Sequence, residues 1–168
     1  MATCPSCGSE NRSGARFCDV CGSPLAAGPR RAEVRKTVTI LFADVTGSTA
    51  LGERLDPEAM RHVMGRYFDR AREVVERHGG TVEKFIGDAV MAVFGIPQVH
   101  EDDAVRACRA ACQIRKALQE LNEELERTRG VAVLVRMGLM TGQVVAGDPS
   151  TGERLVTGDA VNVAARLE

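Results

Sequence analysis

The sequence is 168 residues long, with 44% hydrophobic residues, 27% charged residues and a net charge of −1 at pH 7. This composition is typical of a soluble globular protein and argues against a disordered chain. The small net charge offers no bulk attraction to nucleic acid or to an anionic membrane. No run approaches the roughly 18 apolar residues of a membrane span, and "MATCPSCGSE" lacks the apolar core of a secretory signal. We therefore expect a cytoplasmic protein with neither nucleic acid nor a membrane as its partner.

Four cysteines near the N-terminus form two C-x2-C pairs, Cys4 with Cys7 and Cys18 with Cys21. In a reducing compartment this pattern favours a metal site over disulfides. Four thiolates complete the tetrahedral shell of one Zn²⁺ and leave no open position, which is typical of a structural site. We therefore predict a zinc ribbon over residues 1–24 that folds because the metal binds. The alternative, a redox dithiol, needs a surrounding βαβ pattern that is absent here.

The ribbon's partner is predicted from its few charges. Arg12 and Arg16 make only a thin basic surface, which favours contact with another protein, or support of a dimer, over binding to DNA or RNA. The following stretch, "GSPLAAGPRRAEVRK", is small and basic and carries two prolines. We interpret residues 25–36 as a flexible linker.

The main domain, residues 37–168, opens with the apolar, β-branched run "TVTILFADV", which predicts a buried strand. Asp56 and Pro57 then predict the cap and first turn of a helix that ends at His78. Its apolar residues recur with a helical period and predict one buried face. They are Met60, Val63, Met64, Tyr67, Phe68, Ala71, Val74 and Val75.

Two strands, "TVEKFI" and "AVMAVFG", flank Gly87 and Asp88 and predict a hairpin with a short turn. A second helix is expected over about residues 101–127. Its predicted inner face is Ala104, Ala107, Cys108, Ala111, Ile114, Leu118, Leu121 and Leu125. We expect Cys108 and Cys112 to pack in or beside this face as small apolar side chains, without a redox or metal role.

Two more strands are predicted in "VAVLVRMGLMTG" and "QVVAGD", with a possible third in "RLVTG", before a last helix that carries Asn162 and Arg166. The order β-α-β-β-α-β followed by extra strands is the ferredoxin-like arrangement. We therefore predict an α+β fold in which helices cover one face of an antiparallel sheet, with the small zinc ribbon ahead of it.

Two aspartates are expected at one edge of this sheet. Asp44 ends the first strand and Asp88 lies in the hairpin turn, and the topology makes the strand and the hairpin neighbours. Two close carboxylates repel unless a cation lies between them, and oxygen ligands suit Mg²⁺ or Mn²⁺. The alternative makes Asp44 the acceptor of a turn around Thr46 and Ser48, and Asp88 an ordinary hairpin residue.

Four segments resemble the motifs of class III nucleotidyl cyclase catalytic domains, the adenylate and guanylate cyclase family. They are "LFADVTGSTALGERLDPE", "EKFIGDAVMAVFG", "MGLMTGQVVAG" and "VTGDAVNVAARLE", in the order and spacing of the family. The similarity covers roughly residues 37–168. It implies an adenylate cyclase that converts ATP to 3′,5′-cyclic AMP and pyrophosphate in signal transduction.

The resemblance also implies roles for single residues. Asp44 and Asp88 would hold two Mg²⁺ or Mn²⁺ ions, helped by the backbone carbonyl of Val45. One ion would activate the ribose 3′-hydroxyl and the other would bind the triphosphate. Lys84 matches the lysine that recognises adenine.

Asn162 would orient the ribose, and Arg166 would stabilise the charge that builds on the α-phosphate. Residues four apart share one face of a helix, although a solvated polar stripe has the same spacing. In the family, a head-to-tail dimer shares the active site: the two metal-binding aspartates come from one subunit, and Lys84, Asn162 and Arg166 would come from the other. A homodimer would then hold two sites.

The chain departs from the family pattern at two places. Leu155 stands where the family usually has an aspartate or threonine beside adenine, and losing that polar partner lowers base discrimination by about 1–3 kcal/mol. Family domains also continue past the "NVAAR" helix, and that part includes a lysine that binds the triphosphate, so we expect this chain to be part of a longer protein. The alternative functions are a weak or inactive cyclase-like module that binds nucleotide for regulation, and a dimerisation scaffold for the ribbon.

Overall fold

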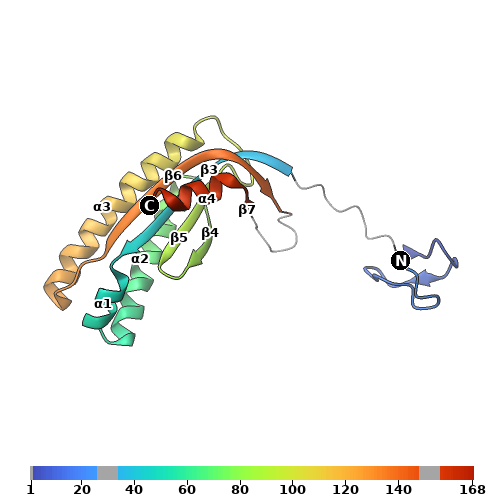
Figure 1. The fold of residues 1–168 in the computed structure, drawn as a ribbon, viewed down its shortest axis with the longest axis horizontal. Coiled ribbons are helices and arrows are strands. Elements are labelled where there is room, and N and C mark those ends of the chain that lie inside the picture. Colours follow the sequence, from blue (N-terminus) through green and yellow to red (C-terminus); the bar gives the residue numbers. More distant parts are fainter. Residues whose placement is uncertain (1, 26–33, 148–155) are drawn as a thin grey trace. The chain divides into compact units, whose positions relative to one another are not determined.

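The structure is a computed structural model that describes residues 2–25, 34–147 and 156–168 (Figure 1). It divides into two compact units, Met1–Glu33 and Val34–Glu168. Residues 26–33 of the predicted linker lie outside the described residues, as does Leu155.

The first unit is a small ribbon around the four N-terminal cysteines. Strand β1 (Ala2–Thr3) pairs antiparallel with β2 (Glu10–Asn11). The buried apolar side chains of this unit are Cys4, Cys18 and Leu25, with Ala15 packed against them. Because so little apolar surface is buried, the ribbon has almost no hydrophobic core of its own.

The second unit is built on one antiparallel sheet with the strand order β4-β5-β3-β6-β7. Its strands are β3 (Val34–Thr46), β4 (Thr81–Ile86), β5 (Ala89–Phe94), β6 (Leu134–Ala146) and β7 (Val156–Thr157). Its helices are α1 (Ser48–Arg54), α2 (Pro57–Arg77), α3 (Asp103–Arg129) and α4 (Asp159–Arg166). The order β3-α2-β4-β5-α3-β6, with β3 between β5 and β6, is ferredoxin-like and confirms the predicted fold class.

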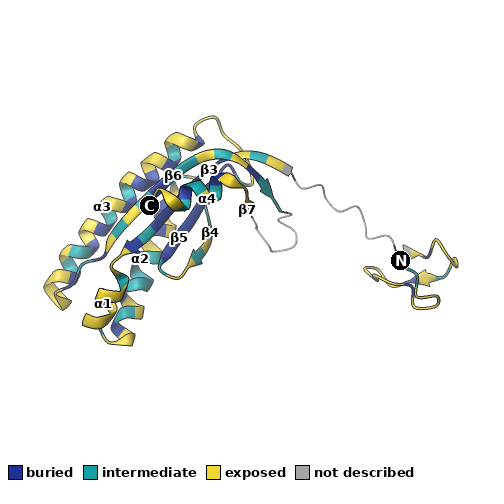
Figure 2. Cartoon of the chain, viewed as in Figure 1, coloured by how far each residue is buried: buried dark blue, intermediate teal, exposed yellow. Residues whose placement is uncertain are grey.

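Helices α2 and α3 pack on one face of this sheet and enclose the larger core. The Asp56 side chain accepts a 2.8 Å hydrogen bond from the Ala59 amide, so the predicted cap of α2 is confirmed. The predicted inner stripe of α2 is confirmed as well, and Figure 2 shows buried residues concentrated in β3 and β5 beneath these helices. Among the described residues, no helix has the length and apolar character needed to cross a membrane.

Helices α2 and α3 cover one face of the sheet, as predicted, whereas the last helix, α4, packs on the opposite face (Figure 1). Its Ala160 and Ala164 lie against β6 where that strand carries glycines. A Cβ atom at Gly138 would collide with the Ala164 carbonyl, and one at Gly142 would lie 2.7 Å from the Ala160 Cβ. The two glycines therefore form a notch that lets the helix approach the strand closely.

Two strand boundaries differ from prediction. Residues 134–146, the greater part of "VAVLVRMGLMTG" and "QVVAGD", form one long strand, β6, because Gly142 serves as a contact surface for α4 and does not break the strand. Strand β3 begins at Val34, three residues before the predicted start, because Val34 to Lys36 pair with the far end of β6. The short helix α1 was not predicted.

Ala104 and Cys108 are exposed, so their predicted place on the inner face of α3 is wrong, and Cys112 is exposed as well. The buried stripe of α3 follows Ala107, Ala110, Ala111, Ile114, Leu118, Leu121 and Leu125, together with Asp103. The two thiols lie beside this stripe and line, with His78, a hollow of about 450 Å³ on the outer side of the helix.

Candidate active site and zinc centre

The four cysteine sulfurs of the ribbon converge on one point. All four Sγ atoms lie within 4.8 Å of one another, and the Cys4–Cys21 and Cys7–Cys18 pairs are 3.7 and 3.6 Å apart. Both C-x2-C pairs repeat the same backbone hydrogen bonds. The amide of the first cysteine donates to the carbonyl two residues past the second cysteine, and the glycine amide directly after the second cysteine donates to the carbonyl of the first. Within the described residues, no other group of three or more His, Cys, Asp or Glu side chains is gathered this closely.

Local hydrogen bonds favour the thiolate form that a metal requires. Backbone amides of Cys21 and Val20 lower the pKa of Cys18 to about 6, and the Val20 amide lies 3.4 Å from the Cys18 sulfur. Ser23 lowers the pKa of Cys21 through its hydroxyl and its amide. The Cys7 amide lowers the pKa of Cys4 through a hydrogen bond, but burial and the thiols of Cys7 and Cys21 together raise that pKa above its ordinary value. The convergence of all four sulfurs on one point fits a tetrahedral Zn²⁺.

The two aspartates lie at the edge of the sheet where β3 extends beyond the end of its pairing with β5. The last β3–β5 pair is Ala43 with Val90, and beyond it the β4–β5 hairpin turns at Gly87 and Asp88. Gly87 adopts a φ of 63°, as a tight hairpin turn requires at its first central position. Asp44 directly follows Ala43, which places it beside that turn. The residue is half-buried there.

Three carboxylates, those of Asp44, Asp88 and Glu168, lie close enough at this corner for their charges to interact. Burial raises the pKa of Asp44, and the charge of Asp88 raises it further. Burial, followed by Asp44 and Asp88, likewise raises the pKa of Glu168 after the end of α4. Glu168 Oε2 is also the one buried side-chain oxygen or nitrogen in the described residues that has no hydrogen-bond partner. Repelling carboxylates and an orphaned oxygen fit a site for a divalent cation.

Arg136 belongs to the same corner and was not named from the sequence. It pairs directly with Asp44 across the β3–β6 register. Its charge lowers the pKa of Asp44, although burial and the charge of Asp88 raise that pKa more strongly. Directly paired residues share one face of a sheet. Once β3 and β6 are taken as neighbours, counting the register from the sequence would have found this arginine.

Lys84, Asn162 and Arg166 lie on the face of the sheet that carries α4. Lys84 pairs with Met91, whose side chain packs in the core beneath α4, while Asn162 and Arg166 belong to α4 itself. All three are exposed. Considering only the described part of the chain, none of the three makes a side-chain hydrogen bond or ion pair, so nothing joins them to Asp44 or Asp88.

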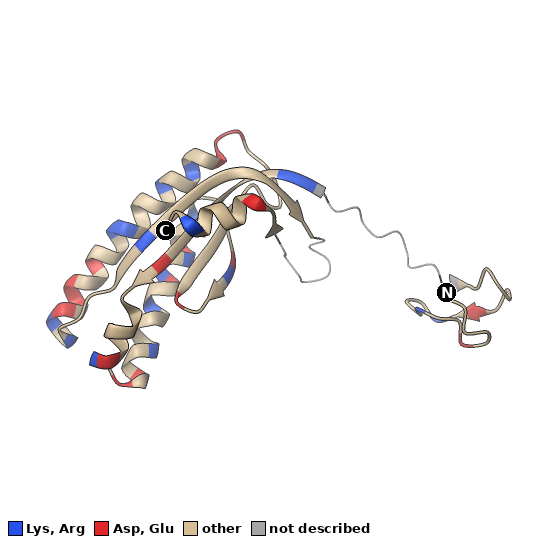
Figure 3. Cartoon of the chain, in the orientation of Figure 1, with Lys and Arg blue, Asp and Glu red and all other residues tan. Residues whose placement is uncertain are grey.

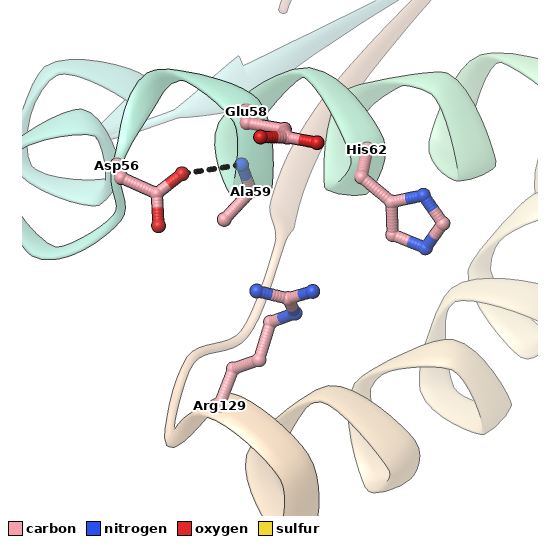
Figure 4. Close-up of a pocket in the computed structure, with 5 residues that line it drawn as sticks. All are labelled: Asp56, Glu58, Ala59, His62 and Arg129. Carbon is pink, nitrogen blue, oxygen red and sulfur yellow. Dashed lines mark hydrogen bonds between the residues drawn. The ribbon is translucent and has the colours of Figure 1, made fainter.

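Other surface features do not compete with this corner. Figure 3 shows charges of both signs on α2 and α3, with most acidic residues of α3 gathered in its second half. A hollow of about 330 Å³ lies between the start of α2 and the end of α3 (Figure 4). It is lined by Asp56, Glu58, Ala59, His62 and Arg129, and none of these is a predicted site residue.

A ferredoxin-like sheet with one aspartate near the end of its central strand and a second in the neighbouring hairpin turn has the arrangement expected of a nucleotidyl cyclase catalytic domain. The adenylate and guanylate cyclase catalytic domain family matches residues 31–168, and a zinc-ribbon family matches residues 3–25. The chain therefore belongs to the adenylate and guanylate cyclase family, with a zinc ribbon at its N-terminal side.

Individual relatives include enzymes with either base preference. Adenylate cyclase 1 of Rhizobium meliloti (strain 1021) is 37% identical over 142 residues, covering 82% of this chain and 21% of the relative. A crystallised guanylyl cyclase superposes with a TM-score of 0.75 at 34% identity, covering 81% of this chain and 71% of the other. The adenylyl cyclase CyaB of P. aeruginosa gives 0.74 at 34% identity, with 80% and 72% covered. The chain thus spans about a fifth of the length of the curated relative.

Proposed function

We propose that this protein is an adenylate cyclase that forms 3′,5′-cyclic AMP and pyrophosphate from ATP in intracellular signalling. The observation that carries the proposal is the corner where Asp44, Asp88 and Arg136 meet on a cyclase fold. Two carboxylates beside a guanidinium suit a divalent cation bound to a triphosphate. The carboxylates would bind the cation, and the guanidinium would bind the phosphate oxygens.

Asp44 and Asp88, with the Val45 carbonyl, would hold two Mg²⁺ or Mn²⁺ ions. Bound there, the ions would supply positive charge that acidifies the ribose 3′-hydroxyl and neutralises the triphosphate. Arg136 lies on the same face and would bind phosphate oxygens, since a guanidinium offers several donors in one plane. The charge of Arg136 would also limit the repulsion between the aspartates.

Lys84 is the residue that favours ATP over GTP. It is exposed on the edge strand β4 with its charge unpaired among the described residues, and it matches the adenine-recognising lysine of the family. Leu155 would line the same base pocket without a hydrogen bond, so we expect selectivity for ATP to be modest.

The complete site would form between two copies of the chain. Asn162 and Arg166 are four apart on α4, exposed, and free of contacts with the metal-binding aspartates of their own chain. A ribose and an α-phosphate held by these residues would meet the aspartates of a second copy in a head-to-tail homodimer. Two equivalent sites would result.

The decisive test measures cyclic AMP from ATP with Mn²⁺, using the full-length protein. Asp44→Ala and Asp88→Ala should each abolish the product, whereas persistent activity in either variant would rule out the proposed metal site. GTP serves as the matched substrate, and Lys84→Glu should shift the ratio of the two products toward cyclic GMP. If ATP binds tightly and no cyclic product forms, the domain is a nucleotide-binding regulatory module instead.

Mixing two inactive variants tests the shared site. A heterodimer of Asp44→Ala and Arg166→Ala chains has one site that carries both changes and one that carries neither. An equal mixture should therefore recover about one quarter of wild-type activity, since half of the dimers are mixed and each has one intact site. No recovery in a mixture that has exchanged subunits would place both residues in the same chain's site.

The ribbon is proposed to hold one structural Zn²⁺ and to contact another protein. Phe17 and Val20, on either side of Cys18, expose 61% and 72% of their surface and would supply the apolar part of such a contact.

A further inference from the structure

A buried tyrosine from α2 reaches the backbone beside the candidate cation site. Tyr67 is fully buried, and its hydroxyl donates a 3.0 Å hydrogen bond to the Ala43 carbonyl oxygen. That carbonyl belongs to the same planar peptide unit as the amide nitrogen of Asp44. Holding the carbonyl in one direction therefore holds the plane from which the Asp44 side chain departs.

The hydrogen bond falls where β3 loses one of its two neighbours. Pairing with β5 ends at Ala43, whereas pairing with β6 continues through Thr46. From Asp44 onward the strand is supported on one side only. The Tyr67 hydroxyl restrains the backbone at this point, so it takes over part of the role of the missing strand.

Tyr67 acts from the face opposite the carboxylate. Its ring packs with Ala43 in the core beneath α2 and α3, while Asp44 faces the side of α4 with Arg136. Burial raises the pKa of Tyr67, as do the charges of Asp44, Asp88 and Glu168, so the hydroxyl keeps its proton and remains a donor. Tyr67 can thus restrain the backbone without occupying a coordination position.

We propose that Tyr67 is a positioning residue for the divalent-cation site, in which its hydroxyl fixes the Ala43–Asp44 peptide and so aims the Asp44 carboxylate and the Val45 carbonyl. The inference rests on the proposed function, because it assumes that Asp44 binds the cation. It adds a residue outside the cation's own ligands, and such supporting hydrogen bonds commonly change metal affinity by about 10–100-fold.

Tyr67→Phe is the direct test, because it keeps the ring that fills the core and removes only the hydroxyl. Mn²⁺ binding to the full-length protein without nucleotide, followed by electron paramagnetic resonance, should weaken about tenfold. Turnover should follow the metal: activity falls at limiting Mn²⁺ and returns to within about twofold of wild type at saturating Mn²⁺, because the hydroxyl takes no part in the chemical step.

Thr39→Val is the matched control. Thr39 is also buried in β3, five residues before Asp44. Its hydroxyl forms a 2.8 Å hydrogen bond with the hydroxyl of Thr141. This variant loses a buried hydroxyl from the same strand and should leave Mn²⁺ affinity unchanged. Equal Mn²⁺ affinity in Tyr67→Phe and Thr39→Val would overturn the positioning role and leave Tyr67 as a core residue.

Asp44→Asn in the same binding assay distinguishes the cation site itself from the positioning role of Tyr67. If Asp44→Asn abolishes Mn²⁺ binding and Tyr67→Phe weakens it, both the cation site and the positioning role stand. If only Asp44→Asn has an effect, the positioning role fails and the cation site remains. If neither variant changes binding, the proposed cation site is wrong and the inference falls with it.

Discussion

The ribbon and the cyclase domain are held together by different means. The ribbon buries two cysteines and one leucine as its apolar core. The cyclase domain has a sheet with apolar clusters on both faces and helices covering each of them. A metal must therefore provide in the first unit what hydrophobic burial provides in the second. Small domains rely on such ions because their surface is large for their volume.

The two candidate metal sites differ in the same way. The ribbon sulfurs stand within 4.8 Å of one another, ready for one closed tetrahedral shell. In the cyclase corner, the charge of Asp88 adds to burial in raising the pKa of Asp44, and both aspartates add to burial in raising the pKa of Glu168. These three carboxylates do not form such a close cluster. Thiols can approach one another as neutral groups, whereas ionised carboxylates keep apart until a cation and its ligands arrive. A structural site closes and a catalytic site stays open.

Removing zinc should break the ribbon and spare the cyclase domain. A Cys4→Ser, Cys7→Ser double variant keeps only two of the four thiols, so its zinc content should fall from one ion per chain to none. Without the ion, residues 2–25 should lose their dispersed amide resonances, because three small buried side chains cannot hold the fold. Elemental analysis and nuclear magnetic resonance measure the two effects.

Cys108→Ser, Cys112→Ser is the matched control, since it removes two exposed thiols outside the ribbon. It should keep one zinc per chain and a folded ribbon. A ribbon that stays folded without zinc would contradict the contrast drawn between the two units.

A cavity in the main core should have the opposite effect. Ile114 on α3 is 1% exposed and belongs to the cluster beneath α2 and α3. Ile114→Ala should lower the free energy of unfolding of the cyclase domain by about 2–5 kcal/mol, because buried contacts are lost and a cavity remains. Zinc content should not change. Urea unfolding followed by far-ultraviolet circular dichroism measures the loss, and an effect near zero would mean that the cluster is loosely packed.

Much of this fold was predictable because local patterns agree with the final packing. The apolar stripe of α2, its Asp56 cap and the Gly87 turn each depend on neighbours within a few residues, and each was predicted. The roles given to the candidate site residues stay predictions, because they come from short motifs and not from contacts within this chain. Arg136 was missed because its relation to Asp44 exists only across two paired strands.

The remaining errors arise from contacts that no local pattern encodes. Gly142 resembles a strand breaker in the sequence, yet it lies inside β6 because Ala160 of a distant helix needs the space. The same contact sets the face that α4 covers. Cys108 fits a helical stripe by spacing, but the observed stripe is rotated toward Ala110 and leaves that thiol exposed.

The smallest expected effect concerns the ion pair that joins α2 to α3. Arg66 donates two hydrogen bonds, of 2.7 and 2.6 Å, to the Glu124 carboxylate. These bonds lower the pKa of Glu124, so the stabilisation is fully present above the ordinary glutamate pKa and is lost as pH falls through the lowered value. The side chains are 29% and 43% exposed, so solvent screens much of the interaction.

Glu124→Gln should therefore flatten the decline in melting temperature of the cyclase domain as pH falls below about 4.5, and the difference from wild type should shrink in high salt. Glu73→Gln is the matched control, because Glu73 pairs with Arg77 within α2 alone and joins no second helix. Identical pH profiles for the two variants would show that the bridge between α2 and α3 adds nothing to an ordinary surface pair. The cyclase domain would then depend on its apolar core alone, just as the ribbon depends on its metal.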